Sequence, residues 1–236
     1  ARDGANAIRL ALETSRPGYD VFNIFAGDTV MTRPNAELVA EVFPDVEIRG
    51  ELGINTSLTS TAKAERLLGW VPQRDATVIR KLREAGAIIL AKTSMSEWAR
   101  GGFDNIGTAL PSFARNPYNT AHGTGGSSGG TGAGLAASYG VVGLGSDTWG
   151  SIRNPSSNNA LVGLRPSWAL VSRAGMLGLY DERDTAGPMA RSVADLVALL
   201  DVIAGVDPAD PATAGAEGHI PASFATGLDA DGLKGK

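Results

Sequence analysis

The stretch GTGGSSGGTGAGLAASYGVVGLGSDTWGSIR, residues 123–153, decides the fold class of this chain. It begins with a glycine-rich turn that leads into a run of small residues suited to a helix. A short apolar strand, VVGLG, and a second turn, SDTWGSIR, follow. The chain between Ser127 and Ser151 is long enough for one helix and one return strand. We therefore expect the two serine-bearing turns to meet at the same edge of a sheet.

Glycines beside a serine have a physical use in acyl transfer. They let the main chain approach a substrate carbonyl closely and point successive N–H groups at the oxyanion that forms there. A serine alone is a poor nucleophile, so a neighbouring base must remove its proton. The two turns therefore favour serine-based acyl-transfer chemistry.

The sequence before the glycine turn predicts an αβ unit. A helix is expected after Arg74, with Asp75 as its N-cap and Gly86 ending it. The apolar residues 87–91 then predict a buried strand. Residues 100–124 have no sustained period and are expected to be irregular.

The sequence after the second turn predicts further α/β elements. ALVGLRPS, residues 160–167, indicates a short strand. Ser192 with Asp195 approximates a capping box before a regular helix over 193–204. The tail after Val206 is rich in Ala, Gly, Pro and Asp and is expected to be mobile. The expected fold class is α/β, with helices flanking a mixed sheet.

These motifs resemble the amidase-signature family of serine hydrolases. The resemblance rests on GGSSGG and GSDTWGSIR, supported in the family's order by KTSMSEWA (92–99), ARNPYN (114–119), GLRPS (163–167) and GPMARSVADL (187–196). It implies a partial amidase-signature domain over residues 73–236. The implied activity is hydrolysis of a small carboxylic amide or ester, without metal or cofactor.

The resemblance also implies a role for each residue of the two turns. Ser151 would be the nucleophile, and Ser127, on a cis peptide bond, would relay its proton. The implied oxyanion hole consists of backbone amides, and two charged residues would brace the loop. The amides are those of Thr148, Trp149, Gly150 and Ser151, and the bracing residues are Asp147 and Arg153.

The chain departs from the family pattern at two points. Trp149 stands where many relatives have glycine, which would narrow the acyl pocket. The family's catalytic lysine is expected in the window 44–56, PDVEIRGELGINT, which contains no lysine. The nearest lysines are Lys63 and Lys92. Of these, Lys92 is the candidate surrogate base, if desolvation lowers its pKa.

Residues 1–72 resemble a different family. DVFNIFAGDTVMTRPNAELVAEVFPDVEIRG (20–50) and TSTAKAERLLGW (59–70) are similar to the C-terminal lobe of extended short-chain dehydrogenases of the sugar epimerase kind. The glycine fingerprint for dinucleotides and a Tyr-x-x-x-Lys pair are both missing, so redox chemistry is not supported. We expect a small N-terminal α/β lobe over residues 1–72, joined by fusion to the amidase-like part.

Composition limits the function classes. The chain has 21 basic and 25 acidic residues, a net charge of −4, and no run of Lys or Arg that would indicate a nucleic-acid partner. It has no cysteine, so a disulfide, a thiolate nucleophile and a Cys-ligated metal are excluded. No apolar stretch is long enough to span a membrane, so a cytoplasmic protein is expected. A homo-oligomer is compatible with the sequence, which does not fix the oligomeric state.

Four other interpretations remain open from the residues. The Gly-Ser turn is compatible with a flexible linker or a phosphate-binding loop, although it lacks the Gly-Lys-Ser/Thr ending of the latter. Gly126-x-Ser128-x-Gly130 fits the elbow of an α/β-hydrolase, with Ser128 as nucleophile and His219 as a distant base. Finally, the chain could be a remnant that has lost its base and acts as a folded or interaction module.

Overall fold

The computed structural model describes residues 74–96, 99, 114–232 and 234–235. The chain divides into two compact units, one of Ala1–Asp75 with Gly86–Lys92 and one of Ala76–Ala85 with Thr93–Lys236. Most of the first unit, including the expected epimerase-like lobe over residues 1–72, lies outside the described residues. The elements below belong to the second unit.

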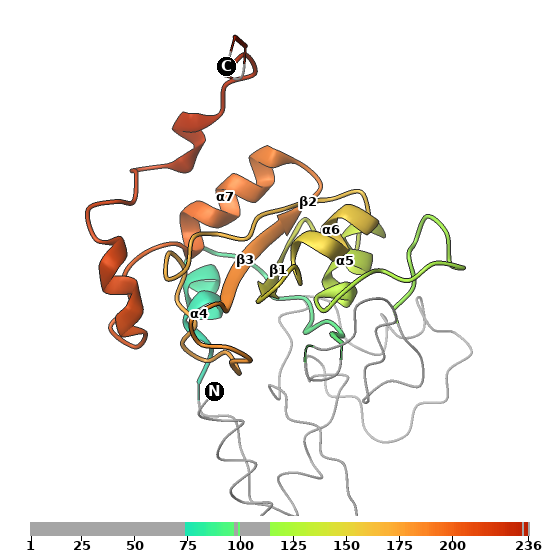
Figure 1. Ribbon diagram of the computed structural model, residues 1–236, viewed down its shortest axis with the longest axis horizontal. Coiled ribbons are helices and arrows are strands. Elements are labelled where there is room, and N and C mark those ends of the chain that lie inside the picture. The colour runs from blue at the N-terminus through green and yellow to red at the C-terminus, as the bar shows by residue number, and fades with distance from the viewer. Residues whose placement is uncertain (1–73, 97–98, 100–113, 233, 236) are drawn as a thin grey trace, which may run out of the picture. The chain divides into compact units, whose positions relative to one another are not determined.

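The centre of the second unit is a three-stranded sheet with the order β1-β3-β2 (Figure 1). β1 is Val142–Asp147, β2 is Val162–Gly163 and β3 is Thr185–Ala190. The strands β1 and β2 were expected from the sequence, whereas β3 was not. Both pairings are antiparallel, so among the described strands the expectation of a mixed sheet is corrected. The reason is that β3 runs between the other two and opposite to both.

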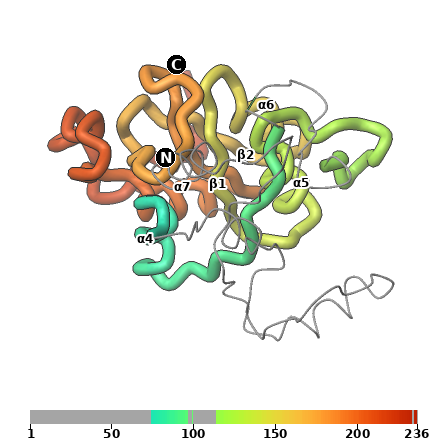
Figure 2. Tube along the Cα trace, turned by 90° about the horizontal axis from the view of Figure 1, so that it is seen from below, coloured from blue at the N-terminus to red at the C-terminus, as the bar shows by residue number. Residues whose placement is uncertain are grey.

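Helices cover both faces of the sheet, as α/β packing requires (Figure 2). On one face, α5 (Gly129–Ala136) and α6 (Arg153–Asn158) lie over a buried cluster formed with Met189 of β3. On the other face, α7 (Val193–Ile203) packs on Ala190. Successive residues of a strand point to opposite faces, so Met189 and Ala190 each serve one layer. The clusters are Leu135, Ile152 and Met189 on the first face, and Ala190, Leu196 and Val197 on the second.

The helix ends follow the sequence signals only in part. Ser192 caps α7 by accepting a hydrogen bond from the amide of Asp195 (3.1 Å), which confirms the predicted capping box. The helix after Arg74 is α4 (Thr77–Glu84), and its N-cap is Ala76, with no side-chain cap bond. The expectation of Asp75 as N-cap is therefore wrong. Gly86 has φ of +85°, a conformation that ends helices at little cost for glycine, as predicted.

Two other local expectations are corrected. Residues 87–91 have no strand hydrogen bonds to any described residue, and Ile88 and Leu90 are exposed rather than buried. A strand needs a ladder partner, which periodicity does not supply. The start of the tail is fixed, because Asp207, Asp210 and Thr213 are buried and hydrogen-bonded. Two 3₁₀ helices follow, Pro211–Ala216 and Phe224–Gly227.

The helices of the described residues are also short relative to a bilayer. None of them has the length and apolar character needed to cross a membrane.

Candidate active site

The two serine-bearing turns lie side by side, as their spacing predicts. The amide of Ser128 donates a hydrogen bond to the carbonyl oxygen of Ser151 (3.1 Å). A second bond joins the amide of Gly126 to Oδ1 of Asn154 (2.9 Å), on the helix that follows Ser151. Main-chain amides of the glycine turn thus hold the two turns together.

The elements between the turns explain why they meet. Helix α5 begins directly after Ser128, and β1 returns the chain to the same edge. The Ser128 hydroxyl is buried and bonds both to the amide (3.1 Å) and to the carbonyl oxygen (3.3 Å) of Ser146. Gly145 allows this contact, because a Cβ there would lie 2.9 Å from Oγ of Ser128. Ser128 therefore joins the glycine turn to the end of β1.

Ser127 combines burial with an unpaired hydroxyl. Its peptide bond with Gly126 is cis, as the resemblance implies, and its carbonyl oxygen accepts a bond from the amide of Ser96 (2.9 Å). The residue is only 1% exposed, yet Oγ has no hydrogen-bond partner among the described residues. Buried polar atoms without partners are rare and point to a functional role or to a missing neighbour.

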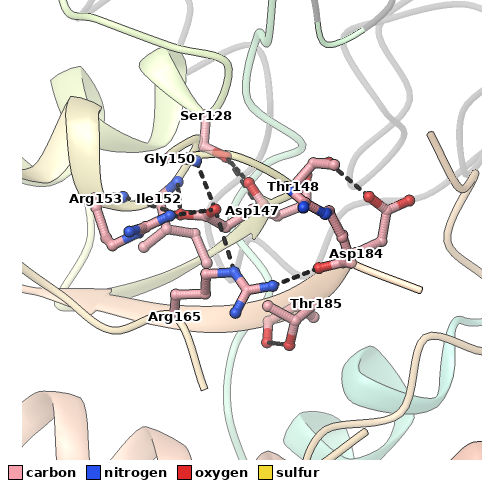
Figure 3. A network of polar contacts seen from close by, with 12 residues as sticks. Ser128, Asp147, Thr148, Gly150, Ile152, Arg153, Arg165, Asp184 and Thr185 are labelled. Atoms are coloured by element: carbon pink, nitrogen blue, oxygen red, sulfur yellow. Dashed lines mark hydrogen bonds and ion pairs between the residues drawn. The ribbon is translucent and has the colours of Figure 1, made fainter. Parts of the chain in front are cut away.

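Asp147 is the buried anchor of the second turn (Figure 3). Its carboxylate accepts hydrogen bonds from the amides of Gly150 (2.7 Å) and Ile152 (3.1 Å) and from Nε of Arg153 (3.1 Å). Burial alone would raise the pKa of Asp147. The hydrogen bonds from Arg153 and from the two amides outweigh burial and hold this pKa below its usual value. The carboxylate thus folds the turn around itself, and Arg153 lies against it.

The sequence reasoning missed two charged residues beside this turn. Arg165 forms an ion pair with Asp147, with Nε 3.5 Å from Oδ1, and donates to the carbonyl oxygen of Arg183 (2.7 Å). Asp184 accepts a hydrogen bond from the hydroxyl of Thr148 (2.5 Å). Arg165 lies in the quoted motif GLRPS, so a signal for it was present, whereas no spacing signal marked Asp184.

The amides implied as oxyanion donors differ in their contacts. The Gly150 amide is directed at Asp147, whereas in the described part of the chain no hydrogen bond involves the amides of Thr148, Trp149 or Ser151. Three main-chain donors, at the expected nucleophile and two and three residues before it, therefore have no acceptor among the described residues. An oxyanion is the kind of acceptor that such amides stabilise.

The side chains around the turn leave one side open. Ser151 is partly exposed, and Trp149 is 63% exposed although it contacts two residues of the segment before β3. The ring of Tyr180 lies 6.2 Å from that of Trp149, and the guanidinium carbon of Arg183 lies 5.9 Å from it. An aromatic surface with a nearby positive charge thus borders the turn.

Two further candidates from the sequence are Lys92 and Ser128. Lys92 is exposed and belongs to the other compact unit, so its role as a surrogate base stays a prediction. The elbow interpretation of Ser128 is corrected, because no strand precedes the residue within 114–127 and its hydroxyl is bound to Ser146. Among the described residues, no group of three or more His, Asp or Glu side chains is arranged to hold a metal ion.

Comparison with known proteins identifies the family of this arrangement. The Amidase family model matches residues 53–228. A probable amidase of Arabidopsis thaliana is 41% identical over 195 residues, covering 81% of this chain and 38% of the relative. One of the chains of the glutamyl-tRNA(Gln) amidotransferase of Lactiplantibacillus plantarum is 37% identical over 229 residues, 97% of this chain and 42% of the relative.

A solved structure agrees with the sequence relatives. The native peptide amidase of Stenotrophomonas maltophilia superimposes with a TM-score of 0.67 at 45% identity, covering 72% of this chain and 35% of that one. The chain belongs to the Amidase family. It spans less than half the length of each of these relatives.

The family match also bears on the N-terminal segment. It begins at residue 53, inside the range 1–72 that was expected to be epimerase-like. The comparisons give no support to the epimerase resemblance, and that segment lies outside the described residues. The domain boundary near residue 73 stays a prediction.

Proposed function

We propose that this chain carries the acyl-transfer centre of an amidase and hydrolyses a carboxylic amide or ester through an acyl-enzyme on Ser151. The observation that carries the proposal is the buried hydroxyl of Ser127, which has no hydrogen-bond partner in the described part of the chain. It lies on a turn whose next amide is bonded to the carbonyl oxygen of Ser151. A hydroxyl in that place is suited to relay a proton from the nucleophile.

The chemical steps follow from the roles of these groups. Ser151 Oγ attacks the substrate carbonyl as its proton passes towards Ser127, and the amine or alcohol leaves with a proton. The amides of Thr148, Trp149 and Ser151, which have no acceptor within the described ranges, receive the negative charge on the carbonyl oxygen. Water then attacks the ester on Ser151, releasing the carboxylic acid and restoring the hydroxyl.

Primary amides are the first substrates to test. The relatives include a peptide amidase and a component of an amidotransferase, and a primary amide leaves as ammonia. Release of ammonia from a C-terminally amidated peptide and from glutamine, compared with hydrolysis of a nitrophenyl ester, would separate amide from ester preference. Loss of each signal in Ser151→Ala would assign it to this site.

Labelling with a fluorophosphonate, which reacts with activated serines, tests the proposal directly. We expect labelling of the natural chain and its loss in Ser151→Ala, because the general-base contribution to such nucleophiles is about 10²–10⁴-fold and a methyl group cannot react at all. Ser157→Ala is the matched control, since Ser157 is an exposed serine on α6. Equal labelling of the natural chain and Ser151→Ala would leave only the rival interpretation, a folded module without catalysis.

A further inference from the structure

One buried carboxyl group joins the nucleophile turn to the segment that precedes β3. Asp184 is 5% exposed, lies beside Thr148 (Figure 3) and accepts three hydrogen bonds. One comes from the hydroxyl of Thr148 (2.5 Å), and the others come from the amides of Leu179 and Tyr180, the latter at 2.8 Å. Side chain and main chain from two separate loops therefore share a single acceptor.

The contact with Thr148 complements the contact made by Asp147. Asp147 pairs with Thr185 at the end of the β1–β3 ladder, so Thr148 and Asp184 lie just beyond the last paired residues. The Asp147 carboxylate draws the later part of the turn inward through the amide of Gly150. Asp184 holds the first residue of the same turn through its hydroxyl. The short peptide between Thr148 and Gly150 is thus fixed at both ends.

The contact with Tyr180 places the aromatic surface beside the turn. The amide bond to Asp184 fixes the main chain of Tyr180, whose ring lies 6.2 Å from the ring of Trp149. Trp149 itself follows Thr148 directly. The same carboxyl group therefore sets both members of the aromatic pair, one from each loop.

We propose that Asp184 is a positioning residue for the acyl-transfer reaction, acting through Thr148 and Tyr180. This inference rests on the proposed function of Ser151. Asp184 touches no reacting atom. By holding the Thr148 hydroxyl it directs the amides of Thr148 and Trp149 towards the developing oxyanion. By holding the main chain of Tyr180, it keeps the Tyr180 ring in place beside the Trp149 ring.

Substitutions at both ends of the Thr148–Asp184 bond test the inference. Asp184→Asn removes one acceptor oxygen, Thr148→Val removes the hydroxyl at nearly constant shape, and Thr148→Ser keeps it. We expect the rate of fluorophosphonate labelling to fall about tenfold in the first two variants, less than the loss caused by deleting an oxyanion donor outright. Thr148→Ser, which keeps the hydroxyl donor, should label faster than Thr148→Val.

Hydrogen exchange provides a readout that does not require reactivity. Mass spectrometry of the peptide that covers residues 148–151 should show faster exchange of the Gly150 amide, which is hydrogen-bonded to Asp147, in Asp184→Asn and Thr148→Val, and natural exchange in Thr148→Ser. A loss that came from general destabilisation would accelerate exchange in helix α7 as well. Circular dichroism verifies that each variant is folded.

Ser172→Ala is the matched control for this test. It deletes another buried hydroxyl–aspartate bond of 2.5 Å, that between Ser172 and Asp207, which lies outside the nucleophile turn. The control should leave both labelling and exchange at residues 148–151 unchanged. An equal slowing in the control and in Thr148→Val would overturn the positioning role.

The outcomes separate the two proposals. Natural labelling and natural exchange in Asp184→Asn and Thr148→Val would overturn the role of Asp184 and leave Ser151 as nucleophile. A natural chain that does not label would remove the proposed function, and unchanged exchange in the variants would then remove the positioning role as well.

Discussion

Two buried aspartates organise two turns of the second unit, and their surroundings differ. Asp147 binds main-chain amides together with Arg153 and Arg165, while Asp210 binds the amide and the guanidinium of Arg173 (2.8 and 3.0 Å). In both cases hydrogen bonding outweighs burial, and the pKa of the carboxyl group lies below its usual value. Arg173 is the largest influence on the pKa of Asp210, whereas for Asp147 the largest is burial, which opposes the shift.

The difference lies in the neighbouring polar atoms. Around Asp210, the hydroxyls of Ser172 and Thr213 are both hydrogen-bonded. In the glycine turn, which is bonded to the turn of Asp147 through Ser128 and Ser151, Ser127 Oγ has no partner among the described residues, and neither does Asn159 Oδ1 at the end of α6. A buried polar atom without a hydrogen bond costs about 1–3 kcal/mol of stability. A turn that contributes only to stability is therefore expected to have its buried polar atoms hydrogen-bonded. The comparison marks the Asp147 region as the one shaped for chemistry.

The largest expected effect is the loss of stability on removing the Asp147 carboxylate. Asp147→Ala leaves the amides of Gly150 and Ile152 without their acceptor and removes the ionic contacts of this buried carboxylate with Arg153 and Arg165. Breaking such a buried ionic contact costs about 3–5 kcal/mol. Urea unfolding followed by circular dichroism measures this loss.

Asp210→Ala is the matched comparison for that prediction. We expect a smaller loss, about 1–3 kcal/mol, because Arg173 keeps its contact with the carbonyl oxygen of Asp181 and its stacking on Trp168. Fluorophosphonate labelling, measured where both variants are folded, should fall in Asp147→Ala alone. Equal effects on labelling would break the distinction between the two regions.

A second pair of variants sharpens the contrast between unpaired and paired hydroxyls. Ser127→Ala should slow labelling of Ser151 by about 10²-fold, as expected for loss of a proton relay. Its stability should stay equal or rise by about 1 kcal/mol, because the removed hydroxyl had no partner among the described residues.

Ser172→Ala should show the opposite pattern. Its hydroxyl donates to Asp207 and accepts from the amide of Ala174, so its removal should lower stability by about 1–3 kcal/mol and leave labelling unchanged. A stability loss in Ser127→Ala without a change in labelling would assign Ser127 a purely structural role.

The sequence predicted the elements whose signals are local. The helix after the glycine turn, the strand β1, the capped helix α7 and the meeting of the two serine turns all follow from spacing and end signals. Central β3 was missed because Pro188 argues against a strand inside a sheet, since proline cannot donate to the ladder. That position is tolerated here because Pro188 accepts a bond from the amide of Leu164 rather than donating one.

The sequence predicted those parts of the candidate site whose residues are close together in the chain. Asp147 and Arg153 lie on one turn, so their pairing was open to inference from the motif. Asp184 and Tyr180 are brought to that turn only by the antiparallel register of β1 and β3. Such contacts depend on tertiary pairing, which no periodicity in the intervening chain encodes.

The smallest expected effect is on the pH dependence of the unfolding free energy, to which both aspartates contribute. Both carboxyl groups have a pKa lowered by folding, so the unfolded chain binds their protons more readily and each adds stability above about pH 3.9, the ordinary value. This contribution is lost as the pH falls through the lower value of the folded state. Asp147→Asn and Asp210→Asn should each flatten the decline in unfolding free energy between about pH 5 and the acid limit of folding. If the unfolding free energy of both variants fell with pH as steeply as that of the natural chain, neither carboxylate would owe its low pKa to the contacts described above.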